Sequence, residues 1–128
     1  MKPLIIEPGD STPQICLDPK ARRLEFAGDC YPENAHAFFA PVNGWIVDYL
    51  RQPPGDVTRL DFRLAYFNSA CLKWILLLFA QLEEAAERGF LLEIYWYYDE
   101  QNPLSEDQGL SLAEDFSALP ISLCPILD

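Results

Sequence analysis

The sequence predicts an α/β fold, a single domain in which a mixed sheet of about five strands carries three helices mainly on one side. Short segments that alternate apolar and polar residues, or are rich in strand formers, recur along the chain. Longer segments between them repeat apolar residues with helical spacing. The 128 residues contain no repeat, low-complexity stretch or linker, so we expect one compact domain over residues 1–128.

The amino-terminal segments predict an edge strand followed by a hairpin. Residues 4–7 read LIIE, a short run of strand formers before a Pro-Gly-Asp turn. Residues 14–18 and 23–28 alternate apolar and polar side chains, as half-buried strands do. The four residues between them, PKAR, make these two strands a natural antiparallel pair.

After Gly28 the apolar residues change to a helical period. The expected buried face of this first helix consists of Phe38, Val42, Trp45, Ile46 and Tyr49. Pro32 suits the first turn, where its missing N–H has no partner to lose. Pro41 lies inside the pattern, so we expect a kink or a restart there. The helix is expected to end before the Pro-Pro-Gly sequence at residues 53–55.

The central part of the chain predicts a strand, a second helix and another strand. Residues 57–67 mostly alternate, and a helix follows over about 70–88, with Gly89 suited to a left-handed cap. Residues 90–99 are nearly all apolar and rich in strand formers, as a central strand is. The expected buried face of the second helix consists of Leu72, Ile75, Leu76, Phe79 and Leu82.

The carboxy-terminal segments predict an acidic turn, a short helix near residues 105–116 and an optional last strand at residues 120–124. The turn at residues 99–109 lacks the ligand spacing of an EF-hand, which favours a solvated acidic loop. Two consecutive strand–helix–strand crossovers predict parallel pairing in part of the sheet, beside the antiparallel hairpin.

The composition argues against several functions. The net charge is −11, from 20 acidic and 9 basic residues, so nucleic acids and anionic membranes are repelled and a basic protein partner is favoured. The apolar run at the amino terminus is too short for a signal peptide, and no run is long enough to span a membrane. We therefore expect a cytoplasmic protein without membrane insertion.

The four cysteines and the single histidine do not predict a metal site. Cys16, Cys30, Cys71 and Cys124 are scattered, with no C-x-x-C pair. Because nothing suggests export, we expect reduced thiols rather than two disulfides. Neither a metal nor another cofactor is expected.

Ser69 lies where the strand of residues 57–67 passes into the second helix, and this position has two interpretations. Its hydroxyl could cap the helix, a role that Asn68 could share or take. Alternatively, a phosphate on Ser69 would be favoured by the free N–H groups and the dipole at the helix start. Lys73 lies one turn further on and could pair with that phosphate.

No set of catalytic residues can be assembled from the sequence. A catalytic Cys71 would need a base, and the one histidine, His36, lies far away in the chain; a buried structural cysteine is favoured. No paired-carboxylate site and no Ser/His/Asp set can be assembled convincingly, and a glycine-rich phosphate loop is missing altogether. We therefore expect no enzymatic activity, with a small enzyme that uses Cys71 as a remote alternative.

Three segments together resemble the SiaC family of bacterial regulatory phosphoproteins. They read GDCYPENAHAFFAPVNGWIVDYL, LDFRLAYFNSACLKWILLL and LLEIYWYYDE, and the resemblance extends from about residue 12 to residue 116. The most diagnostic pieces are Tyr31-Pro32-Glu33-Asn34, Tyr66-Phe67-Asn68-Ser69 and the spacing Phe39…Pro41-Val42…Trp45…Tyr49-Leu50.

The resemblance implies a phosphorylation-controlled switch with an architecture like that of STAS anti-sigma-factor antagonists. In such a switch, a serine/threonine kinase of the anti-sigma type adds a phosphate and a PP2C-type phosphatase removes it. The unphosphorylated protein activates a GGDEF diguanylate cyclase and so promotes cyclic-di-GMP signalling and biofilm formation. The acceptor falls on Ser69, and the implied partner interface consists of Tyr31, Glu33, Asn34, Asn68, Ser69 and Lys73. The alternative is an antagonist that acts on a kinase without any cyclase.

Two departures from the family pattern are visible. Ala70-Cys71 replaces the usual hydroxyl-rich continuation, which removes any second acceptor beside Ser69. The acidic run after the tryptophan-containing strand is thinned to residues 99–103. If that acidic run binds the partner in the family, this protein has a different partner from those family members.

Overall fold

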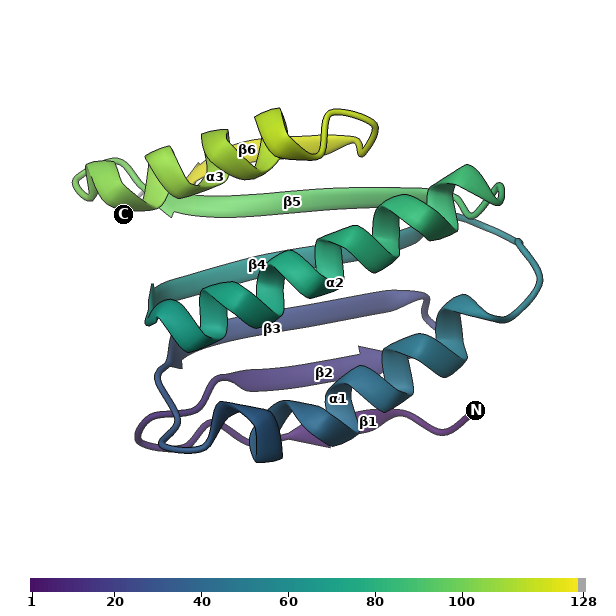
Figure 1. Ribbon diagram of the computed structural model, residues 1–128, viewed down its shortest axis with the longest axis horizontal. Coiled ribbons are helices and arrows are strands. Elements are labelled where there is room, and N and C mark those ends of the chain that lie inside the picture. The colour runs from purple at the N-terminus through teal and green to yellow at the C-terminus, as the bar shows by residue number, and fades with distance from the viewer. Residues whose placement is uncertain (127–128) are drawn as a thin grey trace.

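The computed structural model describes residues 1–126, whose strands form one six-stranded sheet in chain order, β1-β2-β3-β4-β5-β6 (Figure 1). The strands are β1 (Leu4–Ile6), β2 (Gln14–Asp18), β3 (Arg23–Cys30), β4 (Thr58–Phe67), β5 (Leu92–Asp99) and β6 (Ile121–Ile126). The helices are α1 (Ala35–Leu50), α2 (Ser69–Glu87) and α3 (Pro103–Asp115).

The sheet is mixed, as predicted. β1, β2 and β3 pair antiparallel, whereas β3 to β6 pair parallel. Each strand–helix–strand crossover leads to the next strand in the same direction along the sheet. Because these crossovers have the same handedness, their helices lie on one face of the sheet. Figure 1 shows the three helices on that face. The predicted number of about five strands is wrong, because the optional last segment pairs with β5 along its whole length, from Ile94↔Ile121 to Asp99↔Ile126.

The core lies between the sheet and the helices and is centred on a row of aromatic side chains. Phe26, Phe62 and Trp96 occupy one register row across β3, β4 and β5. The rings of Phe26 and Phe62 stack with centroids 4.8 Å apart, and Phe79 of α2 lies 5.3 Å from Phe62. This packing fixes α2 over the middle of the sheet, and therefore fixes where its first residue lies.

The start of α1 differs from the prediction. Asn34 is the N-cap, and its side-chain oxygen accepts a hydrogen bond from the Ala37 N–H at 3.0 Å. Pro32 therefore precedes the helix, and its predicted place in the first turn is wrong. The helix also continues through Pro41 without the restart that would divide it. The carbonyl that loses its partner at Pro41 is that of Ala37, which is itself an exposed residue, so water can bind there.

The buried face of α2 is rotated from the predicted one. Leu76 is 38% exposed, and Leu72 is only half-buried. The buried residues are Cys71, Ile75, Leu78, Phe79, Leu82 and Ala85. The predicted left-handed cap is confirmed, since Gly89 has φ +96°. Residues 74–79 are apolar on every side of the helix, which is why their periodicity did not identify the buried face.

The predicted acidic loop is shorter than expected. α3 begins at Pro103, in the position where proline is favoured at a helix start, so most of residues 99–109 are helical. Within the described residues, no helix is long and apolar enough to cross a membrane.

Candidate functional site

Ser69 is the first residue of α2, and its side chain is exposed. The residue before it, Asn68, is the N-cap, because its Oδ1 accepts a hydrogen bond from the Cys71 N–H at 3.0 Å. The Asn68 N–H donates in turn to the Cys30 carbonyl oxygen at 3.1 Å. The predicted capping role of Ser69 is therefore wrong. The neighbouring asparagine has taken it, and the serine hydroxyl is left facing solvent.

A disulfide joins Cys30, the last residue of β3, to Cys71 in the first turn of α2, with the Cα atoms 6.2 Å apart. Both residues are buried. The expectation of four reduced thiols is wrong for this pair, while Cys16 and Cys124 are free. The two partners are 41 positions apart in the sequence, so the sequence offered no local signal.

The fold explains why these two cysteines meet. β3 and β4 run parallel, and Cys30 is the register partner of Phe67 at the end of β4. The chain enters α2 two residues after Phe67, which places Cys71 beside the end of β3. The prediction that Cys71 is a buried structural cysteine is confirmed. A disulfide-bonded sulfur cannot serve as a thiolate nucleophile, so the structure does not support an enzyme built on Cys71.

The loop between β3 and α1 carries the other predicted interface residues. Because the carboxyl ends of parallel strands share one sheet edge, this loop and the start of α2 lie at the same edge. Tyr31 packs edge-to-face on Tyr66 of β4, with centroids 5.7 Å apart, and donates a hydrogen bond to the Asp10 carbonyl at 3.0 Å. Glu33 and Asn34 are exposed on the loop.

A groove of about 570 Å³ lies between the first halves of α1 and α2. Its lining includes the predicted interface residue Lys73 and also Ala70, the residue after Ser69. The complete lining is Ala35, His36, Phe39, Ala40, Asn43, Ala70, Lys73, Trp74 and Leu77. Sequence reasoning missed this groove. The available signal was that α2 has more apolar residues than one buried face requires.

The walls of the groove are held together by contacts between the two helices. The rings of Phe39 and Trp74 stack with centroids 4.1 Å apart and an interplanar angle of 9°. Further along, the Gln81 side-chain amide donates to the Asn43 side-chain oxygen at 3.2 Å. These contacts bridge α1 and α2, so the groove exists before any partner binds.

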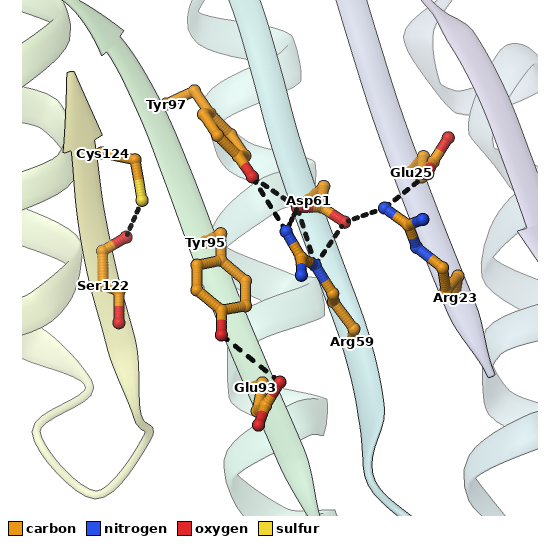
Figure 2. A network of polar contacts seen from close by, with 9 residues as sticks. All are labelled: Arg23, Glu25, Arg59, Asp61, Glu93, Tyr95, Tyr97, Ser122 and Cys124. Carbon is orange, nitrogen blue, oxygen red and sulfur yellow. Dashed lines mark hydrogen bonds and ion pairs between the residues drawn. The ribbon is translucent and has the colours of Figure 1, made fainter. Parts of the chain in front are cut away.

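The face of the sheet opposite the helices carries a separate polar network, centred on Asp61 of β4 (Figure 2). Asp61 is fully buried. Its carboxylate accepts hydrogen bonds from Arg59 (Nε to Oδ2, 3.1 Å), Arg23 (Nη2 to Oδ2, 3.2 Å) and the Tyr97 hydroxyl (to Oδ1, 2.9 Å). The Arg59 guanidinium also lies over the ring of Tyr95, 4.3 Å from its centroid.

The network keeps Asp61 ionised. Burial alone would raise the pKa of this carboxyl, but the hydrogen bonds from Arg59, Tyr97 and Arg23 outweigh that effect and hold the pKa below its usual value. A carboxylate with a lowered pKa and donors on both oxygens is a poor general base. We therefore assign the network to stability. The described residues also contain no group of three or more His, Cys, Asp or Glu side chains placed to hold a metal ion.

The profile of the family described as "SiaC family regulatory phosphoprotein" matches residues 6–126. The chain belongs to the SiaC family. A crystal structure of apo-SiaC from Pseudomonas aeruginosa superimposes with a TM-score of 0.89 at 33% identity, covering 97% of this chain and 99% of that chain. The resemblance inferred from the three sequence segments is thus confirmed.

Two further comparisons extend this result. One is with the crystal structure of the diguanylate cyclase SiaD in complex with its activator SiaC from Pseudomonas aeruginosa; the TM-score is 0.90 at 32% identity, covering 96% of this chain and 99% of the matched chain. The other is with an uncharacterized protein of Pseudomonas aeruginosa strain UCBPP-PA14, 35% identical over 116 residues, or 91% of this chain and 88% of that protein.

Proposed function

We propose that this SiaC-family protein is a non-enzymatic switch that binds and activates a GGDEF diguanylate cyclase while Ser69 is unphosphorylated. The observation that carries the proposal is the close superposition on SiaC, which is the activator of SiaD and was solved bound to it. That likeness favours a cyclase partner over a partner-switching protein that acts only on a kinase.

Phosphorylation of Ser69 is supported by its position. The hydroxyl is exposed at the first residue of α2, where a phosphate would meet free backbone N–H groups and the positive end of the helix dipole. The next two residues, Ala70 and Cys71, offer no competing hydroxyl. A kinase of the anti-sigma type would transfer the γ-phosphoryl group of ATP to Ser69 Oγ, and a PP2C-type phosphatase would hydrolyse the ester. Because ATP and GTP are cytoplasmic substrates, we place the protein in the cytoplasm.

The proposal is tested by cyclic-di-GMP synthesis. The purified protein is added to each GGDEF cyclase encoded in the same genome, with GTP, and product formation is followed by chromatography. Wild type and Ser69→Ala are expected to raise the rate of one cyclase, whereas Ser69→Asp is expected to raise it much less because the added charge resembles a phosphate. If wild type raises the rate of none of these cyclases, the proposed function is wrong.

A further inference from the structure

A small pocket lies where β4, β5 and β6 end and α3 begins (Figure 1). Asp99 and Ile126 are the last described residues of β5 and β6, and α3 starts at Pro103, four residues after Asp99. Parallel strands place their carboxyl ends at one edge of the sheet, and open α/β sheets bind ligands outside that edge. The pocket shares no lining residue with the groove between α1 and α2, so it is a separate feature.

Two opposite charges line this pocket without pairing. Arg63 and Asp99 form no ion pair with each other or with any other side chain of residues 1–126. The Arg63 guanidinium is held over the ring of Tyr97, with its central carbon 4.0 Å from the ring centroid. One oxygen of Asp99, Oδ1, accepts a hydrogen bond from the Gln101 N–H at 2.9 Å. Both groups are therefore positioned by contacts that supply no opposite charge, and each remains available to a ligand.

Two neutral polar side chains of the lining also lack partners. Ser105 is only 7% exposed, and its hydrogen bonds within the described chain are made by its backbone. Its N–H donates to the Asn102 carbonyl oxygen at 3.1 Å, and its carbonyl oxygen accepts from the Trp96 indole N–H at 3.2 Å. Asn102 is the N-cap of α3, yet its side chain makes no capping hydrogen bond. A buried hydroxyl without a partner is costly, and a bound polar molecule removes that cost.

The size of the pocket limits the ligand. Its volume is about 170 Å³. A water molecule takes up about 30 Å³ in the liquid, so a ligand of about six non-hydrogen atoms fits, and a nucleotide or a peptide helix is far too large. Ala65 and Ile126 add apolar lining, which suits a short apolar side chain.

From these observations we propose that the pocket binds a small α-amino acid, whose carboxylate pairs with Arg63 and whose ammonium group pairs with Asp99. The Ser105 hydroxyl and the Asn102 amide supply further hydrogen bonds to the same ligand. A zwitterion has no net charge, so the −11 charge of the chain does not repel it, whereas that charge and the Asp99 carboxylate both repel a phosphate. This inference does not depend on the proposed function.

Titration of the ¹⁵N-labelled full chain, followed by amide NMR spectra, tests the inference. The probes are glycine, L-alanine and L-serine, and acetate and ethylamine are controls that each carry only one of the two charges. Arg63→Gln and Asp99→Asn each remove one charge from the pocket. Arg51→Gln is the matched control, because it removes an exposed arginine of the α1 end that does not line the pocket. Thermal unfolding verifies that each variant is folded.

At least one amino acid is expected to shift the backbone amide signals of Asn102 and Ser105 saturably, with a dissociation constant of about 1 mM. Arg63→Gln and Asp99→Asn should each weaken this binding by about tenfold, and Arg51→Gln should leave it within about twofold of wild type. The inference is overturned if none of the three amino acids gives a saturable shift, or if acetate binds as tightly as the amino acids. Equal affinity of wild type and the two pocket variants would also overturn it, because the ligand would then lie elsewhere.

Discussion

Cys30 and Cys71 are joined by a disulfide that ties the end of β3 to the first turn of α2, two residues after Ser69. The hydrogen bond from the Asn68 N–H to the Cys30 carbonyl makes a second tie between the same two segments. Helix ends usually fray, but this one is attached to the central sheet at both Asn68 and Cys71. The backbone N–H groups that would receive a phosphate on Ser69 are consequently held in place before phosphorylation.

The disulfide predicts a specific thiol count. Protein purified without reductant and unfolded in guanidinium chloride is expected to show two reactive thiols, Cys16 and Cys124, with a thiol-specific dye. After reduction the same protein is expected to show four. Four thiols before reduction would mean that Cys30 and Cys71 are not bonded in the purified protein.

Removing the disulfide is expected to lower the free energy of unfolding. For a loop of 41 residues, the loss of the chain constraint in the unfolded state corresponds to about 4 kcal/mol. Urea unfolding of wild type, with and without a dithiol reductant, measures this difference. The double variant Cys30→Ala/Cys71→Ala serves as the control, because reductant should leave its unfolding midpoint unchanged. An equal midpoint for oxidised and reduced wild type would contradict the prediction.

Ser69 is expected to be the single phosphorylation site in its segment. After incubation with ATP and the cognate kinase of the anti-sigma type, intact-mass spectrometry should detect one phosphoryl group on wild type and on Ser69→Thr, because threonine keeps the exposed hydroxyl at the start of α2. Ser69→Ala should gain none. A phosphoryl group on the alanine variant would assign the modification to another residue.

The sequence predicted the fold well where one structural period dominated. The alternation at residues 14–18 corresponds to β2, and the apolar run at residues 90–99 contains β5. The prediction failed where a segment did not identify a single buried face, or where two residues could fill the same role. The apolar residues 74–79 concealed which face of α2 is buried, and with it the groove. Asn68 and Ser69 are both good caps, and only the backbone geometry decides between them.

The disulfide was missed, and the sixth strand was predicted only as optional, for a different reason, since both depend on contacts between distant parts of the chain. Cys30 meets Cys71 only because β3 and β4 are parallel neighbours. Likewise, β6 is a strand because the exposed edge of β5 offers it a partner. The position of Ser69 in the candidate site came from family resemblance, because residue spacing alone indicated no more than a helix start.

The Asp61 network is expected to make stability depend on acid pH. The pKa of Asp61 is lower in the folded protein than the unfolded value of about 3.9, so its contribution to stability is present above that value and is lost as the pH falls through the folded pKa. Asp61→Asn should therefore lower the free energy of unfolding by about 2 kcal/mol at pH 7, and the difference from wild type should shrink below pH ~4.

Urea unfolding at pH 7 and pH 3 measures this dependence. Glu93→Gln is the control on the same face, because the Glu93 carboxylate is exposed and accepts one long hydrogen bond, from the Tyr95 hydroxyl at 3.3 Å. Glu93→Gln should leave the free energy of unfolding nearly unchanged at pH 7 and at pH 3. A difference between Asp61→Asn and wild type that is constant from pH 7 to pH 3 would show that ionisation of Asp61 is not the cause.

Substitution by alanine is expected to have opposite effects on the free energy of unfolding at two helical glycines, Gly109 and Gly44. A Cβ added at Gly109 in α3 would lie 2.6 Å from Cδ1 of Trp96, and the Trp96 ring is buried, with its indole N–H donating to the Ser105 carbonyl at 3.2 Å. Gly109→Ala must therefore push α3 away from the sheet or displace that ring, which should lower the free energy of unfolding by about 1–3 kcal/mol.

Gly44 in α1 is the matched control. A Cβ at Gly44 meets no atom within 4 Å, so Gly44→Ala should raise the free energy of unfolding by about 0.5–1 kcal/mol through better helix propensity. Thermal unfolding of the two variants checks the pair, and equal shifts would mean that α3 does not pack on Trp96 through Gly109.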